Sequence, residues 1–281
     1  MLSYRHAFHV GNHADVLKHL ILVQLVRYLG QKEKPFWVID THAGAGAYDL
    51  DAVHARKLAE YEGGIGRLWA RRDLPAPVAD YVDLVRHLNP GGRLQKYPGS
   101  PLLALWTMRE QDRLRLFELH SSDARLLRGN FQDAGKRVIV EGSDGFAGLK
   151  ALLPPPPRRA LVLIDPSYEE KQDYERVIQA LKDALTRFPG GTYAVWYPQL
   201  TRLEAHELPQ RLKRLPAGSW LNAALRVREP AKDGFGMHGS GMFVLNPPWT
   251  LHDTLAGVLP FLVETLRADA GAGFTLERQA D

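Results

Sequence analysis

The stretch "RRALVLIDPSYEEK", residues 158–171, contains a short apolar run that ends in a cluster of polar and aromatic side chains. Residues 160–164 form a continuous run of Ala, Leu, Val and Ile, which is typical of a strand buried on both faces of a parallel sheet. Asp-Pro-Ser-Tyr follows at residues 165–168. The sequence therefore predicts a carboxylate, a proline kink and an aromatic ring at the carboxyl end of a buried strand, where α/β proteins bind ligands.

A near copy of this tetrapeptide, Asn-Pro-Pro-Trp, stands at residues 246–249. It follows the last apolar segment and leads into a helical pattern for which Thr250 and Asp253 predict a capping box. Residues 165–168 instead follow the fourth predicted strand, in the middle of the sheet, where a ligand cleft is expected. We therefore assign residues 165–168 to function and residues 246–249 to structure.

Seven short segments rich in Val, Ile and Leu predict strands, and helical patterns occur between them. The segments are residues 35–40, 114–119, 136–142, 160–165, 192–198, 221–227 and 241–246. One helical face comprises Tyr174, Val177, Ile178, Leu181, Leu185 and Phe188, and it ends at Pro189, Gly190 and Gly191. This alternation predicts an α/β fold with a doubly wound sheet.

Two departures from simple alternation refine this prediction. More than 70 residues separate the first two predicted strands, and the excess contains a short helix that ends at Pro90 and Gly91. The last two strands can form an antiparallel hairpin at the end of the sheet. We therefore expect one Rossmann-like sheet of seven strands, formed by residues 1–48 and 100–281, with a helical insertion at residues 49–99.

Composition excludes several classes of protein. The 281 residues are 45% hydrophobic and 24% charged, which suits a globular protein and not a disordered or fibrous one. The absence of cysteine excludes disulfides, thiolate metal sites and a catalytic thiol. No apolar run approaches the roughly 20 residues that span a bilayer, and the first residues lack the apolar core of a signal peptide. We expect a cytoplasmic protein.

The charge distribution hints at a polyanionic partner. The formal net charge is +4, and residues 201–232 carry seven Lys or Arg against three Glu, which accounts for the whole excess. A basic surface segment is often only solvated, so charge alone leaves nucleic acid binding open.

The first 30 residues predict an amphipathic helix and no metal site. Asn12 is a candidate N-cap, Gly30 is a candidate stop, and Leu17, Ile21, Leu25 and Leu29 form one apolar stripe. Four histidines lie nearby with Asp15, namely His6, His9, His13 and His19. They lack a His-Glu-x-x-His pattern, so we expect no metal.

A turn after the first predicted strand, "DTHAGAGAY", suits a cofactor. Gly44 and Gly46 allow close backbone approach, and Asp40 stands at the end of the first strand. Asp49 replaces the third glycine of a dinucleotide fingerprint. Glu118 ends the second strand and can accept both hydroxyl protons of a ribose, and Asp144 follows the third strand, where it can meet an adenine amino group. Each acid alone is also a common cap or turn residue. Together they predict an adenosine-shaped site.

Asp-Pro-Ser-Tyr suits chemistry on the amino group of adenine. That nitrogen is a poor nucleophile because its lone pair is conjugated with the ring, so a catalyst must accept its N–H groups and hold the base. Asp165 can accept one N–H, the carbonyl of Pro166 can accept the other, and Tyr168 can stack on the ring. A simple proline turn with a half-buried Tyr is the alternative reading.

With these motifs assembled, the chain resembles the RlmJ family of bacterial 23S ribosomal RNA adenine-N6 methyltransferases over nearly its whole length. The motifs are "MLSYRHAFHVGNHADVLKH", "DTHAGAG", "YPGSPL", "FELH", "DGF", "LIDPSY", "WYP" and "SGMFVLNPPW". The resemblance implies a Rossmann-like class I methyltransferase with a helical insertion. It further implies S-adenosyl-L-methionine as cofactor and adenine 2030 of 23S RNA or its precursor as target. We expect the protein to be a monomer.

The resemblance also implies roles for individual residues. Cofactor contacts fall on His19, His42, Ser100, Glu118, Asp144, Gly145 and Asp165, beside the turn residue Gly44. Catalysis falls on Asp165 with Pro166 and Tyr168, and the RNA substrate on Tyr4, His6 and Lys18. Ser167 stands where the family has a second proline. The acceptors and the ring survive this change, but the loop loses rigidity.

Three alternatives remain open from sequence. A DNA adenine methyltransferase uses the same type of motif, although no target-recognition domain is evident here. A non-catalytic nucleic-acid-binding protein, linked to the use of external DNA, would not need the cofactor residues. A small-molecule methyltransferase would need neither a loop that grips adenine nor the basic segment at residues 201–232.

Overall fold

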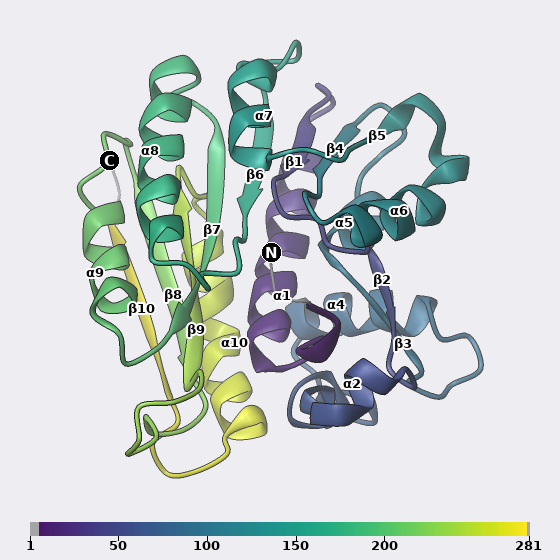
Figure 1. The fold of residues 1–281 in the computed structure, drawn as a ribbon, viewed down its shortest axis with the longest axis vertical. Coiled ribbons are helices and arrows are strands. Elements are labelled where there is room, and N and C mark those ends of the chain that lie inside the picture. Colours follow the sequence, from purple (N-terminus) through teal and green to yellow (C-terminus); the bar gives the residue numbers. More distant parts are fainter. Residues whose placement is uncertain (1–5, 280–281) are drawn as a thin grey trace.

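A computed structural model describes residues 6–279 and shows an eight-stranded sheet between two layers of helices (Figure 1). The strand order is β10-β8-β9-β7-β6-β1-β4-β5. The strands are β1 (Trp37–Asp40), β4 (Arg113–Phe117), β5 (Val138–Glu141), β6 (Ala160–Ile164), β7 (Thr192–Gln199), β8 (Trp220–Arg226), β9 (Gly239–Leu245) and β10 (Gly273–Gln279). Five neighbouring strands of the sheet, β7, β6, β1, β4 and β5, run parallel, so their carboxyl ends share one edge of the sheet.

All seven predicted strands are confirmed, as is the antiparallel hairpin of β8 and β9. The predicted number of strands in the sheet was wrong, because β10 adds an eighth strand antiparallel to β8. Its sequence, "GFTLERQ", is polar and mostly exposed, so it lacks the apolar run that marks a buried strand. This segment is a strand because it pairs with β8, and its local sequence does not predict it.

The helices divide between the two faces of the sheet, each with its own hydrophobic cluster. One cluster is formed with α1 (His13–Gly30), α4 (Ala76–His87), α5 (Ser100–Thr107), α6 (Ser121–Asn130) and α10 (Leu251–Leu266). The other is formed with α7 (Gly145–Leu152), α8 (Gln172–Arg187) and α9 (Leu203–Leu212). No helix within residues 6–279 is long and apolar enough to cross a membrane.

Helix α1 begins as predicted but is buried on more than one face. The side chain of Asn12 accepts hydrogen bonds from the backbone N–H groups of Ala14 and Asp15, at 2.9 and 3.0 Å, and the helix ends at Gly30. The expected amphipathic pattern was wrong, because Asp15 and Lys18 are buried together with the apolar residues of the helix. The sheet, α4 and α5 all pack against α1 and together enclose its polar residues.

Residues 49–99 contain mainly short helices. They include α2 (Val53–Leu58), α3 (Ile65–Trp69) and α4, together with the 3₁₀ helix η2 (Glu60–Gly63). Two short antiparallel strands, β2 (Ala47–Asp49) and β3 (Lys96–Pro98), join the two ends of this segment. Two further 3₁₀ helices, η1 (His6–Phe8) and η3 (Gln132–Arg137), complete the elements. Tyr81 and Val82 of α4 belong to the same cluster as α1, so the insertion shares the core of the sheet domain.

The segment around Asn-Pro-Pro-Trp has a structural role in the described part of the chain. Asn246 has a φ of +52°, and its Nδ2 donates to the carbonyls of Pro189 and Gly191 at 2.8 and 2.7 Å. The predicted capping box at Thr250 was wrong, because no side-chain hydrogen bond caps α10. Thr250 has helical dihedrals (φ −77°, ψ −18°), whereas a capping residue needs extended backbone to turn its hydroxyl toward the first N–H groups.

Candidate active site

A cavity of about 610 Å³ lies at the carboxyl ends of the parallel strands. Residues that follow β1, β4, β5 and β6 line it, together with the first turns of α1 and the end of β7. The cavity therefore contains the two regions that the sequence assigns to cofactor and to chemistry. Residues 41–44, 118–120 and 144–145 line one region, and residues 165–167 with Lys18 line the other.

The turn after β1 is held against the end of β4. Gly44 has a φ of +60°, and a Cβ atom at this position would lie 2.2 Å from the Tyr48 hydroxyl, so glycine is required here. The backbone N–H of Gly44 donates to Glu118 at 2.8 Å, and the N–H of His120 donates to the other oxygen of Glu118 at 2.7 Å. Burial raises the pKa of Glu118 although both hydrogen bonds oppose the shift. The carboxylate is thus fixed beside the cofactor turn.

Asp144 and Gly145 form the start of α7. One oxygen of Asp144 caps the helix by accepting the N–H of Phe146 at 2.9 Å, and the other pairs with Arg176 at 2.6 Å. A Cβ atom on Gly145 would lie 2.1 Å from the carbonyl oxygen of Thr41, so glycine permits the close approach of α7 to the cofactor turn. This contact brings both predicted cofactor residues to the cavity.

His42 lies between the cofactor turn and α7. Its ring packs edge-on against Phe146 at a centroid distance of 5.0 Å, and its Nδ1 lies 2.8 Å from the Thr41 hydroxyl. Burial lowers the pKa of His42 to about 4, so the imidazole is neutral near pH 7. It can act as a neutral hydrogen-bonding surface in the cavity.

Asp40 and Ser100 form a buried pair behind the same turn. The Ser100 hydroxyl donates to Asp40 at 2.7 Å, and the backbone N–H of His42 donates to the other oxygen at 3.2 Å. Burial raises the pKa of Asp40 to about 6, and the hydrogen bond from Ser100 opposes the shift. Ser100 was predicted from the resemblance, and the structure adds Asp40 as its partner.

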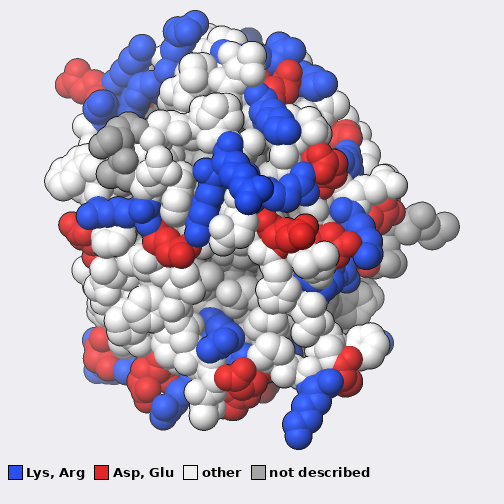
Figure 2. All heavy atoms as spheres, turned by 90° about the vertical axis from the view of Figure 1, so that its left-hand side faces the viewer, with Lys and Arg blue, Asp and Glu red and all other residues white. Residues whose placement is uncertain are grey.

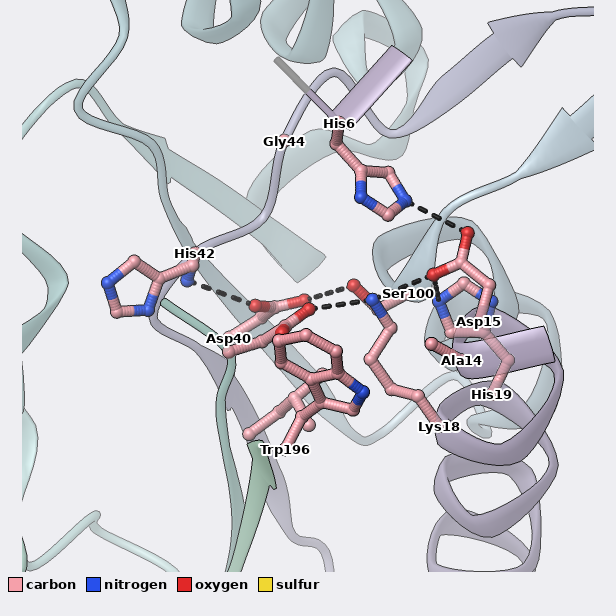
Figure 3. A network of polar contacts seen from close by, with 12 residues as sticks. His6, Ala14, Asp15, Lys18, His19, Asp40, His42, Gly44, Ser100 and Trp196 are labelled. Atoms are coloured by element: carbon pink, nitrogen blue, oxygen red, sulfur yellow. Dashed lines mark hydrogen bonds and ion pairs between the residues drawn. The ribbon is translucent and has the colours of Figure 1, made fainter. Parts of the chain in front are cut away.

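The predicted catalytic residue Asp165 belongs to a buried network with α1. Figure 3 shows the residues of α1 in this network, Asp15 and Lys18, together with His6. Lys18 Nζ lies 2.7 Å from Asp165 Oδ2 and 2.9 Å from Asp15 Oδ1. Asp15 Oδ2 also contacts His6 Nε2 at 2.9 Å and accepts the N–H of Gly11 at 2.8 Å. The fold thus brings His6, Lys18 and Asp165 together, as the resemblance implied.

Burial and charge compete within this network. Burial raises the pKa of Asp165, while the nearby charge and hydrogen bond of Lys18 oppose the shift. Burial would also lower the pKa of Lys18, but the charges of Asp15 and Asp165 outweigh it and hold that pKa well above its usual range. Lys18 is therefore a permanent cation shared by two carboxylates.

His19 lines the cavity but points into the core of the helical layer. Its Nδ1 lies 2.8 Å from the Tyr97 hydroxyl, which in turn lies 2.7 Å from the hydroxyl of Tyr81. Burial lowers the pKa of His19 to about 3, so the ring is neutral. The structure places this predicted cofactor residue in the wall of the cavity and connects it to the insertion.

The residues after Asp165 divide between the cavity and the core. Pro166 and Ser167 line the cavity, whereas Tyr168 is only 1% exposed and has a φ of +53°. The Tyr168 hydroxyl donates to the carbonyl of Trp196 at 2.8 Å, and its ring packs 4.7 Å from that of Tyr174. The structure therefore does not bring the Tyr168 ring into the cavity, and its stacking on a substrate base stays a prediction.

Several residues at the site were not singled out from sequence. Trp196 presents an aromatic side chain to the cavity near Lys18, with the ammonium 5.9 Å from its ring centroid (Figure 3). Trp196 lies in the quoted "WYP" motif, so the resemblance was the available signal for it. Asp15 was named from sequence only beside the four histidines, and its contact with Lys18 was not predicted. Arg176 had no such signal, because it is one charged residue on an amphipathic helix. Tyr4 lies outside the described residues.

The charge of the cavity suits a cationic ligand. Within residues 6–279 its lining includes seven carboxylates, of Asp15, Glu60, Glu118, Asp123, Asp144, Asp165 and Asp173, against Lys18, Arg67, Arg176 and Arg228. In the same residues, no group of three or more His, Asp or Glu side chains is arranged to hold a metal ion. This excess of carboxylates favours a cationic ligand and disfavours a pyrophosphate.

The central strand order, the glycine turn after β1 and the acids at the ends of β4 and β5 define a class I, Rossmann-like methyltransferase. The family model described as "Ribosomal RNA large subunit methyltransferase D, RlmJ" matches residues 33–277, and the chain belongs to this family.

Full-length similarity to individual proteins agrees with this assignment. A protein of Haemophilus influenzae named "Ribosomal RNA large subunit methyltransferase J" is 47% identical over 278 residues, covering 99% of this chain and 98% of its own. An Escherichia coli protein of the same name is 48% identical over 273 residues, covering 97% and 96%. The crystal structure of a Legionella pneumophila protein superimposes with a TM-score of 0.88 and 35% identity, covering 97% of this chain and 98% of that one.

Proposed function

We propose that this protein transfers a methyl group from S-adenosyl-L-methionine to the N6 atom of one adenine in 23S ribosomal RNA. The observation that carries the proposal is the position of Asp165, which lies in the same cavity as the glycine turn and the carboxylate of Glu118. A proton acceptor and a site for an adenosyl group are thus brought together. The names of the Haemophilus influenzae and Escherichia coli relatives support ribosomal RNA of the large subunit as substrate.

The residues present fit the cofactor. Glu118 is oriented by two backbone N–H groups and keeps lone pairs for the hydroxyls of a ribose. Asp40, oriented by Ser100, offers a buried carboxylate of the kind that would hold the ammonium of the methionine part. When bound, S-adenosyl-L-methionine supplies an electrophilic methyl group on a sulfonium. The excess of carboxylates in the cavity favours that cation over its neutral product.

Asp165 and Pro166 prepare the adenine amino group for attack. One N–H of the amine donates to Asp165 and the other to the carbonyl of Pro166, which draws the nitrogen lone pair out of conjugation with the ring. Attack by N6 would form the bond to the methyl carbon while the bond from that carbon to sulfur breaks, so that the electron pair of the broken bond stays on the sulfur. Asp165 then accepts the proton that N6 loses. Lys18 stays paired with Asp15 and stabilises the ionised form of Asp165 before transfer.

The target nucleotide, the compartment and the oligomeric state are also part of the proposal. The target nucleotide, adenine 2030, follows from family resemblance alone. We place the reaction in the cytoplasm, where ribosomal RNA is made, and assign it to a monomer, in which residues 49–99 form a subdomain that supports α1. Tyr168 is proposed to stack on the target base after leaving its present packing.

Methyl transfer from labelled S-adenosyl-L-methionine tests the proposal directly. We expect 23S RNA from a strain lacking the enzyme to be methylated, and RNA from a normal strain to take up little label because its target is already modified. Equal uptake by both RNAs would contradict a single target. Preferred labelling of duplex DNA over an RNA hairpin would favour a DNA methyltransferase, and absence of cofactor binding by calorimetry would favour a non-catalytic binding protein.

A further inference from the structure

The loop between β8 and β9 forms one side of the cavity mouth. Residues 228–236 are all exposed, yet Arg228 and Gly236 line the cavity, as does the next residue, Met237. The mouth on this side is therefore formed by a surface loop and not by the core of the sheet.

Phe235 projects from this loop into solvent. The side chain is 79% exposed, which is unusual for a phenylalanine, so the ring does not help to pack the loop. Its neighbours Gly234 and Gly236 have φ angles of +75° and +83°, so the backbone turns on both sides of the ring. Two left-handed glycines allow this reversal without strain.

Hydrogen bonds hold the loop in this shape. The Thr201 hydroxyl donates to the carbonyl of Gly234 at 2.7 Å, and Arg228 donates to the carbonyl of Met237 at 3.0 Å. The backbone N–H of Phe235 donates to Asp233 at 3.0 Å. The exposed ring is thus presented by a formed loop, which lowers the entropy lost when it binds a partner.

The same loop is connected to the proposed catalytic residues. Thr201 is followed by Arg202, whose guanidinium donates to the carbonyl of Tyr168 at 3.2 Å. Leu203 follows and is 66% exposed. We define Arg202, Leu203, Arg228, Lys232 and Phe235 as the rim surface. Two hydrogen bonds link its parts: Thr201 donates to the carbonyl of Gly234 in the loop between β8 and β9, and Arg202 donates to the carbonyl of Tyr168.

The charges of the rim surface favour a polyanion. The loop also carries two exposed acids, Asp233, which accepts the N–H of Phe235, and Glu229, whose backbone N–H donates to Asp269. Arg228 and Lys232 remain exposed. Lys and Arg side chains also gather in a band across the neighbouring face that includes α8 and α9, with acidic groups beside them (Figure 2).

We propose that the rim surface binds the single-stranded RNA next to the target nucleotide, with Phe235 stacked on a neighbouring base and Arg228 and Lys232 facing phosphates. Every base offers a π-face, so an exposed ring can bind it without reading its sequence, and cations beside the ring suit the backbone. The proposal rests on the proposed function, because the target base must enter the adjoining cavity. RNA is favoured over a protein as the occupant, because the target base of an RNA must enter the cavity next to this ring.

Phe235→Ala and Phe235→Trp test the role of the ring, with Trp249→Ala as matched control. Trp249 is 77% exposed and follows β9, which runs antiparallel to β7, so it lies at the opposite end of the sheet from the cavity. We expect Phe235→Ala to raise the KM for an RNA hairpin by roughly 5- to 150-fold, the range expected for loss of one base–aromatic stack. Phe235→Trp and Trp249→Ala should stay near wild type, and calorimetric affinity for S-adenosyl-L-methionine should not change in any variant.

A fluorescent base gives a direct readout. With 2-aminopurine next to the target adenine, wild-type protein should quench the fluorescence by stacking, and Phe235→Ala should not. If wild-type protein methylates RNA and Phe235→Ala has the same KM and the same quenching, the inference is wrong and the proposed function stands. If Phe235→Ala fails only on assembled ribosomal particles, the ring contacts protein and the inference is also wrong. If wild-type protein does not methylate RNA at all, the proposed function itself fails.

Discussion

Lys18 Nζ lies 2.7 Å from Asp165 Oδ2, although the two residues are 147 positions apart in the sequence. The first comes from the opening turns of α1 and the second from the end of β6. Their pairing exists because α1 packs on the sheet with its buried polar residues directed at the strand ends. A second ion pair of Lys18, with Asp15, makes the pair part of a larger network whose members can be tested separately.

Asp165→Asn should abolish most of the activity without unfolding the protein. Asparagine cannot accept the proton that leaves N6, and loss of such a group typically costs about 10²- to 10⁴-fold in rate. Lys18 keeps Asp15 as partner, so we expect little change in the melting temperature. The check is kcat on 23S RNA, with Asp183→Asn as control, because Asp183 pairs with Arg187 at the surface of α8 and lies outside the cavity lining. Activity within threefold of wild type in Asp165→Asn would remove it from the chemistry.

Asp15→Asn should change the pH dependence of the reaction as well as its rate. The charge of Asp15 raises the pKa of Asp165, and Asp15 shares the Lys18 ammonium with Asp165. Removing that charge lowers the pKa of Asp165, so the acid limb of the kcat profile should shift to lower pH while kcat falls. Lys18, His6 and Asp40 also face Asp165 and are left unchanged in this variant.

A structural role for Asp15 predicts a different result. Asparagine can still accept the N–H of Gly11, so the start of α1 should keep its hydrogen bond. A lower kcat with an unmoved acid limb would then indicate that Asp15 only supports the helix.

Asp40→Asn should stabilise the protein at high pH while weakening cofactor binding. The pKa of Asp40 is about 6 in the folded state against an ordinary value of 3.8, so folding favours the protonated form. The corresponding stability is present below pH 3.8 and is lost as pH rises through 6. Ionised Asp40 therefore costs up to about 3 kcal/mol at pH 8. Asparagine avoids that cost.

Denaturant unfolding of cofactor-free protein at pH 5 and pH 8 provides the measurement. The gain in unfolding free energy for Asp40→Asn should be larger at pH 8, and calorimetry should show at least roughly tenfold weaker binding of S-adenosyl-L-methionine, the loss expected for one charge-assisted hydrogen bond. Equal stability gains at both pH values would contradict the raised pKa.

Tyr168 can be tested for structural and stacking roles with two variants. Tyr168→Phe loses the hydrogen bond to the carbonyl of Trp196 but keeps the ring, and should cost about 1 kcal/mol of stability with little change in KM for RNA. Tyr168→Leu also fills the core but has no aromatic face. A higher KM for RNA in folded Tyr168→Leu would support stacking on the target base, and an unchanged KM would assign the ring to the core alone.

Ser167→Pro restores the residue that the family resemblance expects. Ser167 lines the cavity next to the proposed carbonyl acceptor, Pro166. Proline reduces the freedom of the loop before binding, so we expect turnover to equal or exceed that of wild type by up to about fivefold, equivalent to the roughly 1 kcal/mol that such substitutions contribute. A large loss of turnover would show that the backbone or hydroxyl of Ser167 is used.

Strand identity was predictable because it depends on local composition. The apolar run of β6 and the glycines of the turn after β1 can each be recognised within a few residues of sequence, and both were found where expected. β10 was missed because its polar, exposed sequence becomes a strand only through pairing with β8. The prediction of a capping box at Thr250 was wrong for the opposite reason. The local sequence pattern was present, but the backbone of Thr250 is helical and its side chain caps no N–H group.

The sequence by itself determined the class of fold, the glycine turn after the first strand and the position of Asp165 at the end of a central strand, because each is encoded in a contiguous motif. Only the tertiary structure decided which residues surround that acid. It placed Lys18 and Asp15 against Asp165, kept Tyr168 in the core and put Trp196 and the Phe235 loop at the cavity. Such contacts join distant segments through burial of α1 on the sheet, and the energy of a buried charge depends on partners that no local pattern specifies.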